Sequence, residues 1–114
     1  MENNDDPKTY TVLLTQDTMD DVEAIYTYII VHDSPAAADY VVGQLEKTFG
    51  TLALFPERGG YPPELLEIGI KEYRETFFKP YRIIYRVQDD KVYVMMVVDG
   101  RRNLQTLLLR RLLK

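Results

Sequence analysis

Two stretches in the first half of the chain repeat their apolar residues at the spacing of an α-helix. In the first, Thr18 with Asp21 three residues later has the form of a helix N-cap. In the second, Ser34 and Pro35 have the form of an N-cap and a first-turn proline, and Pro56 ends the pattern. The two apolar faces are Val22, Ile25, Tyr26 and Ile29, and then Ala38, Val41, Leu45, Phe49 and Leu52. Because few residues separate them, the pattern predicts an antiparallel helical hairpin.

Elsewhere apolar and polar residues alternate, which is the period of a β-strand. The alternation predicts strands near residues 10–14, 73–78, 81–87 and 92–98. The links between the last three strands, 79–80 and 88–91, have the length of hairpin turns. At the end of the chain, one face of a short helix carries Leu104, Leu107, Leu108 and Leu112.

This order of elements predicts one α+β domain, residues 1–114, with a frayed tail at 1–8. It holds an N-terminal strand, a helical hairpin, a three-strand antiparallel meander and a short C-terminal helix. We expect the hairpin to cover one face of the sheet and to leave the other face free. In KPYRIIYRV, residues 79–87, the covered face is Tyr81, Ile83, Tyr85 and Val87. Arg82 and Arg86 are then expected to look out from the free face.

Composition excludes several kinds of chemistry. The chain has no cysteine and one histidine, so we expect no disulfide, no thiolate chemistry, no zinc site and no cofactor. Its apolar runs are far shorter than the ~20 residues of a membrane span, and no secretion leader precedes the first acidic residues. We therefore expect a cytoplasmic protein without membrane contact.

The net charge of −4 conceals a difference between the two halves of the chain. Residues 1–72 contain four Lys and Arg against fourteen Asp and Glu, whereas residues 73–114 contain ten against four. This asymmetry suggests that the C-terminal half meets an anionic partner, either nucleic acid or an acidic protein segment. Two solvated faces of opposite sign would produce the same pattern.

Arginines in the C-terminal half are the candidate functional residues. If the strands are adjacent, Arg74, Arg82 and Arg102 converge on one patch, where their planar forks suit phosphate or carboxylate. A solvated face with carboxylate neighbours such as Glu75 is the alternative. The candidate residues for binding a partner are Arg74, Tyr81, Arg82, Arg86, Arg101 and Arg102.

Five segments, in their order and spacing, resemble the RelE/ParE superfamily of toxins from type II toxin–antitoxin modules. They are DDVEAIYTYI, SPAAADYV, LFPERGGYPPEL, YRETFFKPYRIIYRV and VVDGRRN. The resemblance runs from about residue 10 to residue 113, and its most specific part is PYRIIYRV followed by GRR one strand later. It implies the strand–helix–helix–strands fold and a cytoplasmic bacterial protein. It also implies a partly disordered antitoxin that lies across the toxin in a hetero-oligomer.

The superfamily divides by target. RelE-like members cleave mRNA in the ribosomal A site, and Arg74, Arg82 and Arg102 match their basic residues as catalytic candidates. Thr76 stands where a second lysine is expected, however, and Leu108 falls near the position of a late tyrosine. With a sequence pI of about 4.9, these departures disfavour RNA cleavage.

ParE-like members act on DNA gyrase without a nuclease site, and RETFFKPYRIIYRV is closer to that branch. The resemblance therefore predicts a gyrase-directed toxin. A ribosome-dependent endoribonuclease and a non-toxic binding protein of the same fold stay open as alternatives, and with them the question of enzymatic activity.

Overall fold

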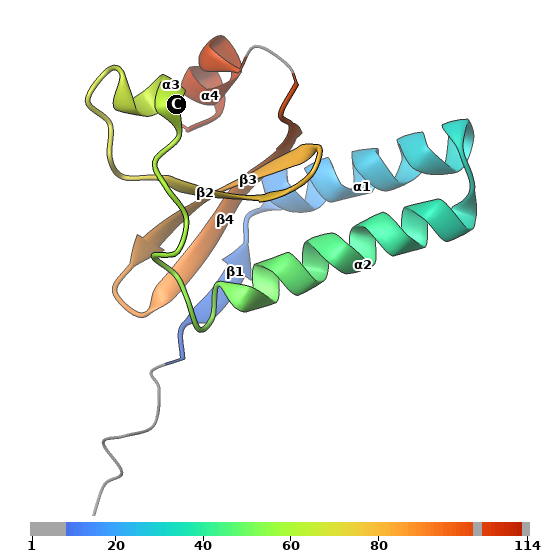
Figure 1. The fold of residues 1–114 in the computed structure, drawn as a ribbon, viewed down its shortest axis with the longest axis horizontal. Helices are drawn as coiled ribbons and strands as arrows, with labels where there is room; N and C mark the ends of the chain where they lie inside the picture. The colour runs from blue at the N-terminus through green and yellow to red at the C-terminus, as the bar shows by residue number, and fades with distance from the viewer. Residues whose placement is uncertain (1–8, 102–103, 113–114) are drawn as a thin grey trace, which may run out of the picture.

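The computed structural model describes residues 9–101 and 104–112. In chain order the elements are β1 (Thr11–Leu14), α1 (Gln16–His32), α2 (Pro35–Thr51), α3 (Pro63–Leu66), β2 (Arg74–Phe78), β3 (Tyr81–Gln88), β4 (Lys91–Asp99) and α4 (Gln105–Leu112). This is the predicted α+β order with one short helix, α3, added between the hairpin and the meander (Figure 1). Within the described ranges no helix has both the length and the apolar character of a membrane span.

The sheet holds four strands in the order β1-β4-β3-β2. β2, β3 and β4 form the antiparallel meander that the alternation predicts, joined by residues 79–80 and 89–90. The second link is shorter than predicted because β3 and β4 each extend by one residue. β1 pairs with β4 in parallel, which is the one pairing that sequence patterns do not indicate. β1 and β2 consequently form the two edges of the sheet.

Hydroxyl side chains cap both helices of the hairpin. Ser34 caps α2 through its side chain, as predicted. The predicted N-cap at Thr18 is wrong, because Thr15 caps α1 by accepting the backbone N–H of Thr18 at 3.1 Å. Thr18 is instead buried, and its hydroxyl donates to the Val94 carbonyl at 2.7 Å. The side chain therefore fastens the first turn of α1 to β4.

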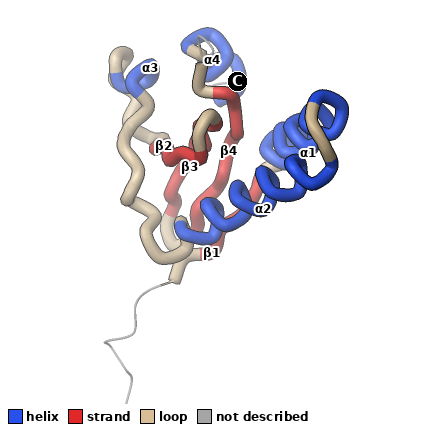
Figure 2. Tube along the Cα trace, turned by 45° about the vertical axis from the view of Figure 1, so that its right-hand side comes forward, coloured by secondary structure: helices blue, strands red, loops and turns tan. Residues whose placement is uncertain are grey.

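Both faces of the sheet are covered. The hairpin packs on one face through Leu45, Phe49 and Leu52 against Ile83, Tyr85, Val92, Val94 and Val97. On the other face, α3 and α4 form a second core with the sheet: Leu65, Tyr73, Ile84, Met96, Val98, Leu104, Leu108 and Leu112. Figure 2 shows the strands between the hairpin on one side and α3 on the other. The prediction of a free face is therefore wrong, because leucines of α3 and α4 pack against the face of the sheet that the hairpin does not cover.

An irregular pairing lets β4 contribute to both cores. Ile84 lies opposite Met96. Its neighbour Tyr85 lies opposite Val94, which leaves Met95 as an extra residue in β4. One extra residue exchanges the two faces of a strand relative to its partner. The β4 residues that face the hairpin core are consequently Val92, Val94 and Val97.

Candidate functional site

The candidate residues do not form one patch. In the pairing of β2 with β3, Arg74 lies opposite Tyr85. Arg82 lies opposite Phe77, three residues further along β2. Directly paired residues share a face, whereas positions three apart on a strand do not. The predicted convergence of Arg74 and Arg82 is therefore wrong, and Arg102 lies outside the described residues.

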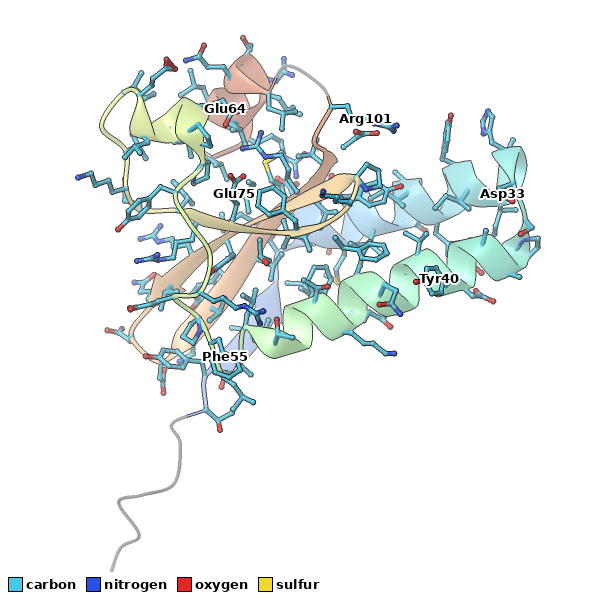
Figure 3. The ribbon with its side chains drawn as sticks, viewed as in Figure 1. Asp33, Tyr40, Phe55, Glu64, Glu75 and Arg101 are labelled. Carbon is cyan, nitrogen blue, oxygen red and sulfur yellow. The ribbon has the colours of Figure 1, made fainter. Side chains whose placement is uncertain are left out.

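Arg82 is buried and bound to two carboxylates. Its Nη1 and Nη2 donate to the two oxygens of Glu64 at 2.6 and 2.8 Å, a bidentate pair. Its Nε donates to Glu75 Oε1 at 2.8 Å. Glu64 comes from α3 and Glu75 from β2 (Figure 3), so one guanidinium joins α3 to two strands. We call Glu64, Glu75 and Arg82 the ion triad.

The electrostatics of the ion triad follow from its burial. Hydrogen bonds from Arg82 lower the pKa of Glu64 below its ordinary value. Burial raises the pKa of Glu75, although Arg82 opposes that effect. The hydrogen bonds to Glu64 and Glu75 raise the pKa of Arg82, which stays charged. The expected outward orientation of Arg82 is wrong, because α3 covers the side chain and neutralises it.

A cleft of about 470 Å³ lies between α1, the ends of β3 and β4, and α4. Two of the candidate residues, Tyr81 and Arg101, line it. We call it the α1–α4 cleft. Its other main lining residues are Asp21, Ile25, Tyr28, Val97, Asp99, Leu107 and Arg111.

Ion pairs shape the walls of the α1–α4 cleft. Arg111 of α4 donates to Asp21 of α1, from Nη2 to Oδ2 at 2.9 Å. The same Asp21 oxygen accepts the backbone N–H of Val97 at 3.0 Å, so the carboxylate links α1, β4 and α4. Arg101 makes two side-chain hydrogen bonds to Asp99, at 2.9 and 2.5 Å, while its side chain stays 76% exposed. Arg101 therefore presents an accessible guanidinium beside the cleft (Figure 3).

The chemistry of the cleft suits the binding of a partner. Burial raises the pKa of Tyr81, so its phenol stays protonated at neutral pH and can donate a hydrogen bond. Tyr28 is exposed and stacks on His32 with ring centroids 4.0 Å apart, which offers an aromatic contact surface. Among residues 9–101 and 104–112 no cluster of His, Cys, Asp or Glu is suited to hold a metal ion.

The sequence indicated Glu75 as a carboxylate neighbour of the arginines, and Arg82 does bind it. Two other acidic partners, Glu64 and Asp21, were missed. Glu75 had a usable signal, because a two-residue link at 79–80 places it diagonal to Arg82 across the β2–β3 pair. Glu64 had none, since it lies on α3, an element that the turn-rich segment 57–69 does not indicate. Asp21 was read as part of a helix start, and its distant partner Arg111 follows only from the tertiary fold.

The remaining two candidate residues, Arg74 and Arg86, lie at the other end of the β2–β3 hairpin. They line a hollow of about 300 Å³ together with Glu57, Lys71, Glu72 and Val87. We call it the basic hollow.

Known proteins resemble this chain in both sequence and fold. A family model described as the ParE toxin of the type II toxin–antitoxin system parDE matches residues 12–104. The toxin ParE3 of Caulobacter vibrioides is 24% identical over 93 residues, which cover 82% of this chain and 89% of that protein.

Two solved structures share the fold. A chain of the chromosomal ParDE system from P. aeruginosa has a TM-score of 0.68 at 17% identity, covering 81% of this chain and 97% of that one. A chain of the RelBE2 toxin–antitoxin complex from Mycobacterium tuberculosis has a TM-score of 0.54 at 22% identity, covering 84% and 97%. The fold is therefore shared with a chain of a ParDE system and a chain of a RelBE complex, while the family model matches most of this chain. This chain belongs to the ParE toxin family of type II toxin–antitoxin systems.

Proposed function

We propose that this chain arrests bacterial growth from the cytoplasm by acting on DNA gyrase, and that a cognate antitoxin neutralises it. Membership of the ParE toxin family supports the toxin role. The relatives of known structure come from toxin–antitoxin systems, which supports an antitoxin as partner. The choice between gyrase and RNA rests on the ion triad.

The ion triad is the observation that carries the choice of target. Phosphoryl chemistry on RNA needs cations free to stabilise negative charge on the phosphate. Arg82 is buried, and its guanidinium is hydrogen-bonded to Glu64 and Glu75. Arg74 lies on the opposite face of the sheet from Arg82. Leu108 is fully buried in the second core, so its position supplies no group for proton transfer. A protein-directed inhibitor needs none of these groups.

The α1–α4 cleft is the surface that we propose for contact with the target. It combines exposed Tyr28, the half-buried phenol of Tyr81 and the accessible guanidinium of Arg101. Aromatic residues and arginine are enriched where protein partners bind tightly. The predicted binding role of Arg102, next to Arg101 in the chain, belongs to the same proposal.

Growth and two reconstituted reactions test this function. Induction of the lone gene is expected to stop growth, and co-expression of the cognate antitoxin is expected to restore it. In vitro, the purified chain is expected to inhibit gyrase supercoiling and to leave a cell-free translation reaction intact. Normal growth at confirmed expression removes the toxin assignment. Cleaved mRNA with unaffected gyrase assigns the chain to the ribosome-dependent nucleases instead.

A charge reversal tests the cleft. Arg101→Glu is expected to weaken gyrase inhibition about tenfold, because it removes an accessible cation from the contact surface. Arg110→Glu, an exposed position on α4 that does not line the cleft, is the matched control. Equal inhibition by both variants places the contact elsewhere.

A further inference from the structure

The basic hollow contains charged side chains that form no ion pair with a described residue. Lys71, Arg74 and Arg86 bring three cations to it. Among the residues that the structure describes, the side chain of Arg86 has no hydrogen-bonded or ionic partner although it is half-buried, and the side chain of Lys71 has none either. Glu57 and Glu72 line the same hollow, and neither forms an ion pair with a described residue. This contrasts with Arg82, Arg101 and Arg111, all of which bind carboxylates.

Arg74 is held in place without being neutralised. Its Nη1 donates to the Gly59 carbonyl at 2.8 Å, and its guanidinium lies 4.8 Å from the centroid of the Tyr61 ring. A carbonyl oxygen and an aromatic face fix the orientation of the fork, but they supply no negative charge. The cation is therefore preorganised in the hollow, which Arg86 also lines.

Arg74 and Arg86 come from opposite faces of the sheet, and both line the hollow at its edge. An anion in the hollow can be bound by either fork, because arginine forks pair bidentately with carboxylate or phosphate. The neighbouring residues Glu57 and Glu72 favour a carboxylate over phosphate as the anion. Both flank the hollow and repel a polyanionic backbone, and the whole chain carries a net charge of −4. A single carboxylate can reach the arginines while avoiding those two residues. Nucleic acid would bring several phosphates into the same field.

The surroundings indicate what kind of segment would carry that carboxylate. Leu54 and Phe55, just before Glu57 in the chain, are 51% and 55% exposed, and Tyr61 is 37% exposed. Figure 3 shows Phe55 on the outside of the molecule, beyond the end of α2. Exposed apolar side chains beside a basic hollow fit a partner that alternates acidic and apolar residues.

We propose that the basic hollow receives a carboxylate from an acidic and apolar segment of the antitoxin, whose apolar residues cover Leu54, Phe55 and Tyr61. This proposal rests on the proposed function, because it requires that an antitoxin exists. It assigns Arg86 and Arg74 as the anion-binding residues of the hollow and Lys71 as an auxiliary cation. The α1–α4 cleft is left for the target.

A direct titration tests the hollow without reference to toxicity. The purified chain, labelled with ¹⁵N, is titrated with the peptide acetyl-Glu-Leu-Glu-Leu-amide and separately with the oligonucleotide dT8. The peptide is expected to shift the side-chain Nε–Hε signals of Arg86 and Arg74. In Arg86→Gln its affinity is expected to fall about tenfold, the effect of losing one charge-assisted hydrogen bond. Lys47→Gln on α2 removes an equal charge away from the hollow and is expected to change nothing.

Three results overturn the proposal. Tighter binding of dT8 than of the peptide at these arginines assigns the hollow to nucleic acid. Shifts that spread over all basic residues, or equal weakening by Arg86→Gln and Lys47→Gln, show only general charge attraction. Unchanged neutralisation of Arg86→Gln by the cognate antitoxin in cells shows that the antitoxin binds elsewhere. If the proposed function itself is wrong, cells that express the unaltered chain will grow normally, which is a separate measurement.

Discussion

Arg82 and Arg86 lie four residues apart on the same face of β3, and they have opposite surroundings. Arg82 is buried and holds two carboxylates at hydrogen-bond distance. Arg86 is half-buried and holds none among the described residues. The difference arises from what covers the strand, because Glu64 of α3 pairs with Arg82 and no described carboxylate pairs with Arg86. The position of an arginine on a strand therefore does not determine whether it is buried in an ion pair or available to bind a partner.

The same comparison separates stability from binding. A buried ion pair stabilises little against an apolar replacement, yet removing one member leaves the other charge buried and uncompensated. A half-exposed cation without a partner has no such dependence, since water solvates it. Substitutions in the ion triad should consequently act on folding, and substitutions in the basic hollow on binding.

The largest effect is expected from breaking the ion triad. Arg82→Ala leaves Glu75, whose side chain is 7% exposed, without its cation. We expect the free energy of unfolding to fall by about 3–5 kcal/mol, measured by urea denaturation. Arg86→Ala, the matched substitution on the same strand face, is expected to change it by less than about 0.5 kcal/mol. Equal losses in the two variants would remove the distinction between the two regions.

A somewhat smaller effect is expected where the two regions touch. A Cβ on Gly59 would lie 2.1 Å from the Glu75 carbonyl oxygen and 2.7 Å from the Tyr85 hydroxyl. Gly59→Ala must therefore move the segment whose carbonyl orients Arg74, at a cost of about 1–3 kcal/mol.

Gly43→Ala on α2 is the control for Gly59→Ala, since its Cβ would meet nothing within 4 Å. Alanine is the better helix former, so this variant is expected to gain about 0.5–1 kcal/mol. Thermal unfolding of both variants measures the contrast. A Gly59→Ala variant as stable as the parent would mean that the segment around Gly59 can move away from Glu75 and Tyr85 without loss of stability.

The two carboxylates of the ion triad should contribute to the pH dependence of stability in opposite directions. The pKa of Glu75 is raised above 4.5, so above about pH 4.5 the folded chain binds more protons and stability falls as pH rises through that raised pKa. The pKa of Glu64 is lowered, so below 4.5 its contribution is lost as pH falls.

Comparing slopes between pH 3 and 7 tests this division. Glu75→Gln is expected to flatten the upper part of the curve of unfolding free energy against pH, and Glu64→Gln the lower part. Urea denaturation at half-unit pH steps measures both. Curves that only shift in parallel with the parent's would show that neither carboxylate titrates as its surroundings imply.

Sequence periodicity was sufficient for the elements of the fold other than α3. The stripes of the hairpin, the alternation around Tyr81 and the leucine face of the last helix each follow from which side chains must be buried. What periodicity leaves open is which layer covers which face. The leucines of the last helix predict burial but do not say that it occurs on the face that carries Arg82.

For the candidate site, the sequence predicted individual residues but not how they are arranged. Spacing identifies the arginines, but their partners come from elements distant in the chain, such as Glu64 on α3. The β2–β3 register that separates Arg74 from Arg82 depends on whether each strand begins one residue earlier or later, and strand ends are the least certain part of a pattern.

A smaller loss of stability than for Gly59→Ala is expected from Arg74→Lys, which keeps the charge of the basic hollow and removes the fork. The lysine loses the donor to the Gly59 carbonyl and the stacking on Tyr61. Because the site is partly exposed and the backbone acceptor can turn to water, we expect a loss of about 0.5–1 kcal/mol in urea denaturation. Peptide affinity is expected to fall severalfold in the same variant, since a point charge replaces a preorganised bidentate donor. Unchanged affinity would mean that the hollow senses charge alone, and it would weaken the contrast with Arg82, whose fork is fully used by Glu64 and Glu75.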